Sequence, residues 1–107
     1  MQLFGEYLRK LREKENLPLR KVAAYLDIDT SILSKIERGE RSINSNLISK
    51  VADCFQLDKE KLLTEYLGEE VAKKIYLENN INEIFEVAEK KIKYLKIKSS
   101  TQGEIKF

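Results

Sequence analysis

The stretch "PLRKVAAYLDIDTSILSKIERG", residues 18–39, decides the fold. Proline suits the first turn of a helix, and the apolar residues that follow Pro18 recur at helical spacing. Asp29 is a typical N-cap residue for a second helix, and Gly39 is a typical residue at which such a helix ends. The stretch therefore predicts two short helices joined by a tight turn, the second of them over 30–38.

The second helix keeps one face free of bulky side chains. Leu33 and Ile36 lie three residues apart and are expected to face a core, and Ala23 on the preceding helix is small enough for the two helices to cross. The residues that then project outward are small or cationic: Thr30, Ser31, Ser34 and Lys35. Small hydroxyl side chains allow the backbone to approach closely, and a lysine reaches guanine O6 and N7. This pattern predicts a helix-turn-helix whose second helix reads base edges in the DNA major groove, and an ordinary helical hairpin with a solvated lysine is the alternative.

Composition excludes several classes of function. The net charge of the 107 residues is only +2, so DNA binding must come from the placement of cationic residues. There is no histidine, which removes the usual nucleophile–base pairs and zinc sites, and we expect no enzymatic activity, metal or cofactor. The single cysteine, Cys54, favours a reducing, cytoplasmic location and is expected to be a buried, unreactive thiol. We expect no membrane span, because no apolar run approaches the roughly 20 residues that a span needs. We expect no signal peptide, because the sequence begins directly with an amphipathic pattern.

The rest of the chain also carries apolar residues at helical spacing, so we expect an all-α protein. The predicted helices are 3–15, 18–27, 30–38, one capped by Asn44, one from 58, one after Gly68 and a last over 81–95. A boundary near Gly68 is expected to divide a DNA-binding domain, 1–67, from a C-terminal helical extension, 68–107. The end of this extension, from 96, is expected to be frayed.

Two segments resemble a known family. They are "LRKLREKENLPLRKVAAYLDIDTSILSKIERGERSI", residues 8–43, and "LISKVADCFQLDKEKLL", residues 47–63. Their most specific parts are "SKIERGER" and "VADCFQLD". This sequence resembles the Xre family, the Cro/CI-type helix-turn-helix of phage repressors and bacterial regulators. The resemblance implies a five-helix, lambda-repressor-like DNA-binding domain, here followed by a two-helix C-terminal extension.

The resemblance also implies roles for individual residues. In the family an arginine late in the first helix pairs with the glutamate of the "IERG" segment, and these are Arg12 and Glu37 here. A solvated surface pair is the alternative. The family's base-reading positions fall on Thr30, Ser31 and Lys35, with Ser34 nearby. Its phosphate-binding positions fall on Arg20, Lys21, Arg38, Arg41, Asn44 and Ser45.

Two positions depart from the family pattern. Leu19 stands where the family often has a glutamine that meets a phosphate, so we expect Arg20 or the backbone N–H groups of that helix to compensate. Asp27 stands where the turn usually has glycine, and aspartate tolerates the left-handed conformation better than most residues. Ile32 has two interpretations, contact with a thymine methyl group or packing on the first helix.

The last predicted helix has a wide apolar stripe. The stripe either folds back on the core of its own chain or pairs with a second subunit, and we favour a homodimer because two recognition helices read paired half-sites. The residues predicted to lie in the dimer contact are Tyr76, Ile81, Ile84, Phe85, Ala88, Ile92 and Leu95.

These observations predict a transcriptional regulator of the repressor or restriction–modification controller type. It would read a pseudo-palindromic operator in double-stranded DNA as a dimer. The alternative is an antitoxin-type module that neutralises a protein partner through its C-terminal helices.

Overall fold

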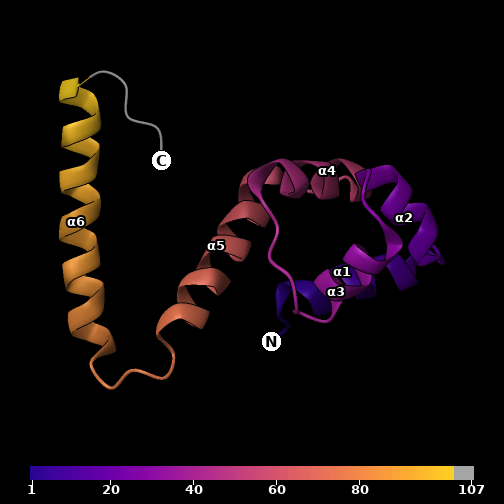
Figure 1. Cartoon of the computed structure of the whole chain (residues 1–107), viewed down its shortest axis with the longest axis horizontal. Helices are drawn as coiled ribbons and strands as arrows, with labels where there is room; N and C mark the ends of the chain where they lie inside the picture. The colour runs from indigo at the N-terminus through magenta and orange to yellow at the C-terminus, as the bar shows by residue number, and fades with distance from the viewer. Residues whose placement is uncertain (103–107) are drawn as a thin grey trace. The chain divides into compact units, whose positions relative to one another are not determined.

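A computed structural model describes residues 1–102, with side chains up to residue 100. The helices are α1 (Phe4–Lys14), α2 (Leu19–Leu26), α3 (Thr30–Glu37), α4 (Ser45–Phe55), α5 (Lys59–Ile75) and α6 (Ile81–Gln102) (Figure 1). Over these described residues there is no strand, and the all-α prediction is confirmed. The chain divides into two compact units, Met1–Lys73 and a second that begins at Lys74.

The first unit contains the hydrophobic core. α1 packs against α3, and α2 packs against both α3 and α4 (Figure 1). The largest side chains that are almost fully buried come from all four of these helices: Leu8, Val22, Leu26, Leu33, Ile48 and Val51. Phe55, Leu62 and Tyr66 extend this core to the end of α4 and to α5. The shared core holds α3 against α1 and α2.

The turn between α2 and α3 depends on Asp27. Its backbone lies in the left-handed region, at φ 58° and ψ 47°, as expected for a residue that replaces glycine there. The Asp27 N–H donates to the Ala24 carbonyl at 3.1 Å, and the Ile28 N–H donates to the Ala23 carbonyl at 3.0 Å. These two bonds satisfy the last carbonyls of α2 in the manner of a Schellman turn. Ala23 is buried where α2 meets its neighbours, as predicted.

A glycine in α1 allows α1 to approach the end of α3 closely. A Cβ atom at Gly5 would lie 2.6 Å from the carbonyl oxygen of Glu37, and it would also collide with the Ile36 carbonyl. These obstacles are backbone atoms, which cannot move aside as a flexible side chain can. The sequence alone did not indicate that a glycine is required at this position.

Two predicted helix boundaries are wrong. α5 runs through Gly68 to Ile75, so the separate helix predicted after Gly68 is the last part of α5, and the predicted domain boundary falls inside this helix. One glycine costs only about 1 kcal/mol in a helix interior, and Tyr66 and Glu69 on either side of it bind the α3–α4 loop and the start of α1. α6 continues to Gln102, so 96–102 is not frayed, because no helix-breaking residue precedes Gly103. The last five residues of the predicted tail lie outside the described residues.

A largely buried ion pair joins α1 to the end of α3. The Arg12 Nε donates to Glu37 Oε2 at 2.8 Å, and a second guanidinium nitrogen donates to Oε1 at 3.0 Å. The third nitrogen donates to the Leu17 carbonyl at 3.0 Å, which adds the α1–α2 loop to the contact. The two side chains are 12% and 5% exposed, so this is not the solvated surface pair considered as the alternative. The hydrogen bonds to Glu37 raise the pKa of Arg12, although burial opposes that shift.

We predict that Glu37→Gln destabilises the fold by about 3 kcal/mol, because the buried guanidinium loses its counter-charge. The control is Glu13→Gln, which breaks the Arg9–Glu13 pair at 3.4 Å, whose side chains are more than half exposed. The control should cost at most about 0.5 kcal/mol. Urea unfolding followed by circular dichroism measures both. If both variants lose the same small amount of unfolding free energy, the buried pair has no structural role.

Candidate nucleic-acid interface

The outer face of α3 is the centre of the candidate interface. Leu33 is completely buried and Ile36 is 4% exposed, so these two side chains attach α3 to the core. Thr30, Ser31 and Lys35 are exposed on the other side of the helix, and Ser34 is half-buried between the two faces. The structure therefore places all four predicted base-reading residues on one short helix, and three of them are exposed.

Ile32 belongs to the core side of this helix. It is half-buried and packs against the hydrophobic core. Of the two interpretations open from the sequence, the structure therefore supports packing, which leaves the accessible surface of α3 to hydroxyl side chains and one lysine.

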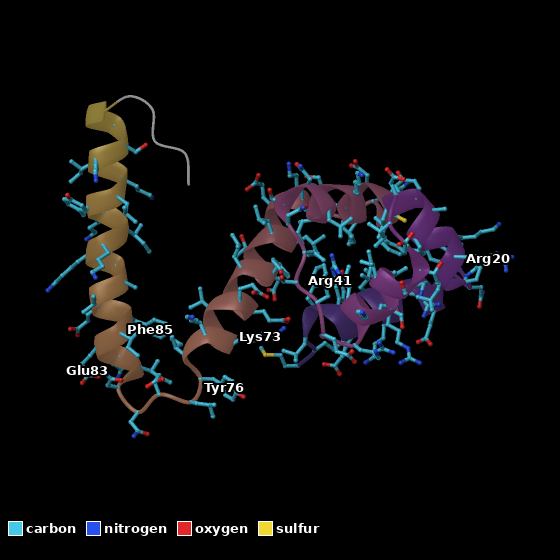
Figure 2. All side chains as sticks on the ribbon, in the orientation of Figure 1. Arg20, Arg41, Lys73, Tyr76, Glu83 and Phe85 are labelled. Atoms are coloured by element: carbon cyan, nitrogen blue, oxygen red, sulfur yellow. The ribbon has the colours of Figure 1, made fainter. Side chains whose placement is uncertain are left out.

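The start of α2 offers unpaired backbone donors beside two cations. Pro18 occupies the N-cap position and provides no side-chain hydrogen bond, and the first two N–H groups of α2 have no acceptor among the described residues. Arg20 and Lys21 are exposed next to these groups, and Arg20 projects away from the helix (Figure 2). Leu19 is half-buried against the core, so this residue packs where the family's glutamine would meet a phosphate. Free N–H groups at a helix N-terminus bind anions, and the expected compensation for Leu19 is therefore available.

The other predicted phosphate-binding residues follow α3. Asn44 is the N-cap of α4, where its Oδ1 accepts a hydrogen bond from the Leu47 N–H at 2.9 Å, and Ser45 is the first residue of that helix. Arg41 is exposed in the preceding loop, nearer to α5 than Arg20 is (Figure 2). Arg38 pairs with Glu40 at 2.9 Å, but both side chains are more than half exposed and such a pair is weak. The structure thus places two groups of cations, one before α3 and one after it.

The charges near α3 remain available to an anion. Among the described residues, no ion pair involves Arg20, Lys21, Lys35 or Arg41. An unpaired exposed cation gains more from a phosphate than one that must first release a carboxylate. The arrangement suits a polyanion that spans both sides of the helix.

Other kinds of site find little support in the part of the chain that the structure describes. It contains no group of three or more residues suited to hold a metal ion, and none of its helices is long and apolar enough to cross a membrane. Cys54 is half-buried, and its pKa is raised by burial and by the nearby charge of Glu15. The sequence predicted a buried, unreactive thiol, and Cys54 is only half-buried; a thiol with a raised pKa is nevertheless a poor nucleophile.

One residue in contact with the candidate interface was not predicted from the sequence. Tyr66 in α5 accepts a hydrogen bond at 2.9 Å from the N–H of Ile43, in the loop between α3 and α4. A signal was available, because Tyr66 lies four residues after Leu62 and three after Leu63 and so continues the apolar face of α5.

Comparisons with known proteins agree with this geometry. Residues 8–62 match the family described as helix-turn-helix. The chain is 34% identical over 64 residues to the HTH-type transcriptional repressor RghR of Bacillus subtilis, a match that covers 59% of this chain and 47% of RghR. It is 32% identical over 62 residues to the control protein C.BamHI of Bacillus amyloliquefaciens, covering 57% of this chain and 76% of that protein.

A solved structure shows the same fold. The restriction-modification controller protein C.AhdI from Aeromonas hydrophila is 30% identical to this chain with a TM-score of 0.51, and the match covers 55% of this chain and 89% of C.AhdI. By contrast, the chain spans only about half the length of RghR. The family match covers half of the chain and contains the whole of α2, α3 and α4. The chain therefore belongs to the Xre-type helix-turn-helix family.

Proposed function

We propose that the protein is a sequence-specific DNA-binding transcriptional regulator of the repressor or restriction–modification controller type. The observation that carries the proposal is the accessible face of α3, where hydroxyl side chains and Lys35 project from a helix whose other face is buried. A helix of this kind enters the major groove with its N-terminal residues on base edges. The names of the similar proteins, a repressor and two controllers, support the same class.

The residues of α3 have different tasks in this proposal. Lys35 is the longest accessible side chain of the face and bonds to guanine O6 or N7. Thr30 and Ser31 lie in the first turn, where short hydroxyl groups bond to bases or phosphates while the helix backbone stays close to the groove floor. Ser34 lies between these groups and allows the same close approach.

The flanking cations bind the DNA backbone. Arg20, Lys21 and the free N–H groups of α2 contact one phosphate strand. Arg41, Ser45 and the N-terminus of α4 contact the backbone on the other side of the groove, with Asn44 and Arg38 beside them. Such contacts supply affinity and orientation, whereas α3 supplies sequence preference.

The protein acts in this proposal by binding and not by catalysis. The absence of histidine from the sequence supports this, because common acid–base and zinc chemistry lacks its usual residue. The proposed location is the cytoplasm, where a bacterial regulator meets DNA.

We predict that selection from a random duplex library enriches an inverted repeat, and that Lys35→Ala relaxes the preference at one base pair in each half-site. The loss should be about 1–3 kcal/mol of discrimination at that base pair, because a direct base contact disappears. The matched control is Lys61→Ala, an exposed lysine of α5 outside the proposed interface. The control should leave the selected sequence unchanged.

Two results would contradict the proposal. One is the absence of any enriched sequence. The other is binding that falls with salt but is indifferent to both substitutions, since that is the behaviour of backbone contacts without base reading.

We further propose that α6 forms the contact of a homodimer. Its apolar residues Phe85, Ala88, Ile92 and Leu95 are spaced by three, four and three residues, which is the alternation of a coiled-coil seam. All four are exposed, Phe85 and Ile92 by half of their surface, and α6 is the only complete helix among the described residues of its unit. One helix cannot cover its own stripe, and a second copy of α6 brings an identical one.

The other predicted dimer residues differ in their positions. Ile81 and Ile84 are half-buried in the first turn of α6. Ile81 lies four residues before Phe85 and continues the stripe, whereas Ile84 lies beside it. Tyr76 lies in the turn after α5 and is 66% exposed, so it is accessible to a partner but is not part of the α6 stripe. The proposed contact is therefore centred on α6.

We predict that the wild-type protein is a dimer at micromolar concentration and that Ile92→Glu makes it monomeric, because the substitution places charge in the seam. Lys90→Glu introduces the same residue at an exposed position of α6 off the stripe and should leave the dimer intact. Sedimentation equilibrium gives the mass of each variant. A monomeric wild-type protein, or a dimer that survives Ile92→Glu, would exclude α6 as the contact. A wild-type protein that is monomeric alone but captured by a different protein through α6 would favour the interaction module instead.

A further inference from the structure

Tyr66 connects α5 to the loop that follows α3. It lies beyond the residues 8–62 that match the family and is only 7% exposed. Its hydroxyl oxygen accepts the hydrogen bond from the Ile43 N–H at 2.9 Å. Its ring packs edge-to-face against Phe4, with ring centroids 5.3 Å apart and an angle of 74° between the planes. Both ends of this side chain are therefore held.

The loop between α3 and α4 has few other restraints. It leaves α3 through Gly39, whose φ is 74°, and enters α4 at Asn44. Among the described residues, the bond to Tyr66 is the only hydrogen bond donated by a backbone N–H between residues 41 and 44. The path of the loop therefore depends on a contact that comes from outside the helix-turn-helix.

Glu69 holds α5 in the position that the Tyr66–Ile43 hydrogen bond requires. Its Oε1 accepts a hydrogen bond at 2.7 Å from the Phe4 N–H at the start of α1, and its Oε2 lies 3.3 Å from the Lys73 ammonium. Tyr66 and Glu69 are three residues apart and so share one face of α5. α1 and α5 together set the position of the tyrosine hydroxyl.

We infer that Tyr66 is a positioning residue for DNA phosphate binding. It holds the α3–α4 loop so that Arg41 and the N-terminus of α4 face the same stretch of DNA backbone. The inference rests on the proposed function. It adds to the interface a residue of α5 that lies beyond the matched residues 8–62. Tyr66 need not touch DNA, because its hydroxyl acts through the backbone of Ile43 on the neighbouring residues of the loop.

The test is a double-mutant cycle between Tyr66→Phe and Arg41→Ala. Tyr66→Phe keeps the ring against Phe4 and removes only the hydroxyl, so the variant is expected to fold. The probe is a mixed-sequence DNA duplex of about two helical turns, because phosphate contacts dominate non-specific binding. Affinity is measured over a range of salt concentrations, which reports the number of phosphate contacts in the slope.

Each single variant should weaken binding about three- to tenfold and reduce the salt slope, because each loses or displaces a charge-assisted contact. The double variant should bind hardly more weakly than Arg41→Ala alone, because an arginine on a displaced loop has already lost its phosphate. Two controls should retain affinity. Tyr94→Phe makes the same chemical change at an exposed tyrosine of α6, and Leu11→Ala reduces stability from α1 without touching the loop.

Three outcomes would overturn the inference. The first is an unchanged DNA affinity of Tyr66→Phe. The second is a loss of binding free energy in the double variant that equals the sum of the two single losses. The third is a loss of DNA affinity in Leu11→Ala equal to that of Tyr66→Phe. If Arg41→Ala leaves affinity and salt slope unchanged in the wild-type background, the phosphate role of Arg41 itself is wrong, and the inference falls with it. Additive losses with a functional Arg41 would remove only the role of Tyr66 and leave the proposed interface intact.

Discussion

The pairing of Arg12 with Glu37 constrains the rest of the first unit. Two hydrogen bonds join the side chains, and the third guanidinium nitrogen binds the α1–α2 loop at Leu17. A charge that is nearly buried must keep its partner, so α1 and the end of α3 cannot shift or rotate independently. The close approach of α1 at Gly5 to the same end of α3 has the same consequence. The orientation of α3 is thus set at its C-terminal end by α1.

The accessible face of α3 is a consequence of this fixed orientation. With Leu33 and Ile36 in the core and Glu37 held by α1, the only side chains left to project are small or cationic. The fold determines which positions face outward, and the residues at those positions determine what the face can bind. Lys35 is exposed among hydroxyl groups and between two sets of cations, and the proposed base contact rests on this arrangement.

Periodicity and caps were sufficient to predict α1 to α4 and the N-cap at Asn44, because these features depend on neighbours within one or two helical turns. The left-handed turn at Asp27 followed instead from the resemblance to the family, which usually has glycine there. The features that were missed depend on residues distant in sequence. α5 continues through Gly68 because of contacts with α1 and the α3–α4 loop, and those contacts are invisible to local propensity. Gly5 and Tyr66 have their roles for the same reason, since each meets a segment more than twenty residues away.

The claim that α3 lies in the major groove can be tested by methylation interference on a selected duplex. Methylation blocks guanine N7 in the major groove and adenine N3 in the minor groove. Interference at guanine N7, in two clusters related by symmetry and separated by about one helical turn or a multiple of it, is the result expected for two recognition helices in successive major grooves. Interference confined to adenine N3, or none at either base, would show that α3 does not read DNA in this way.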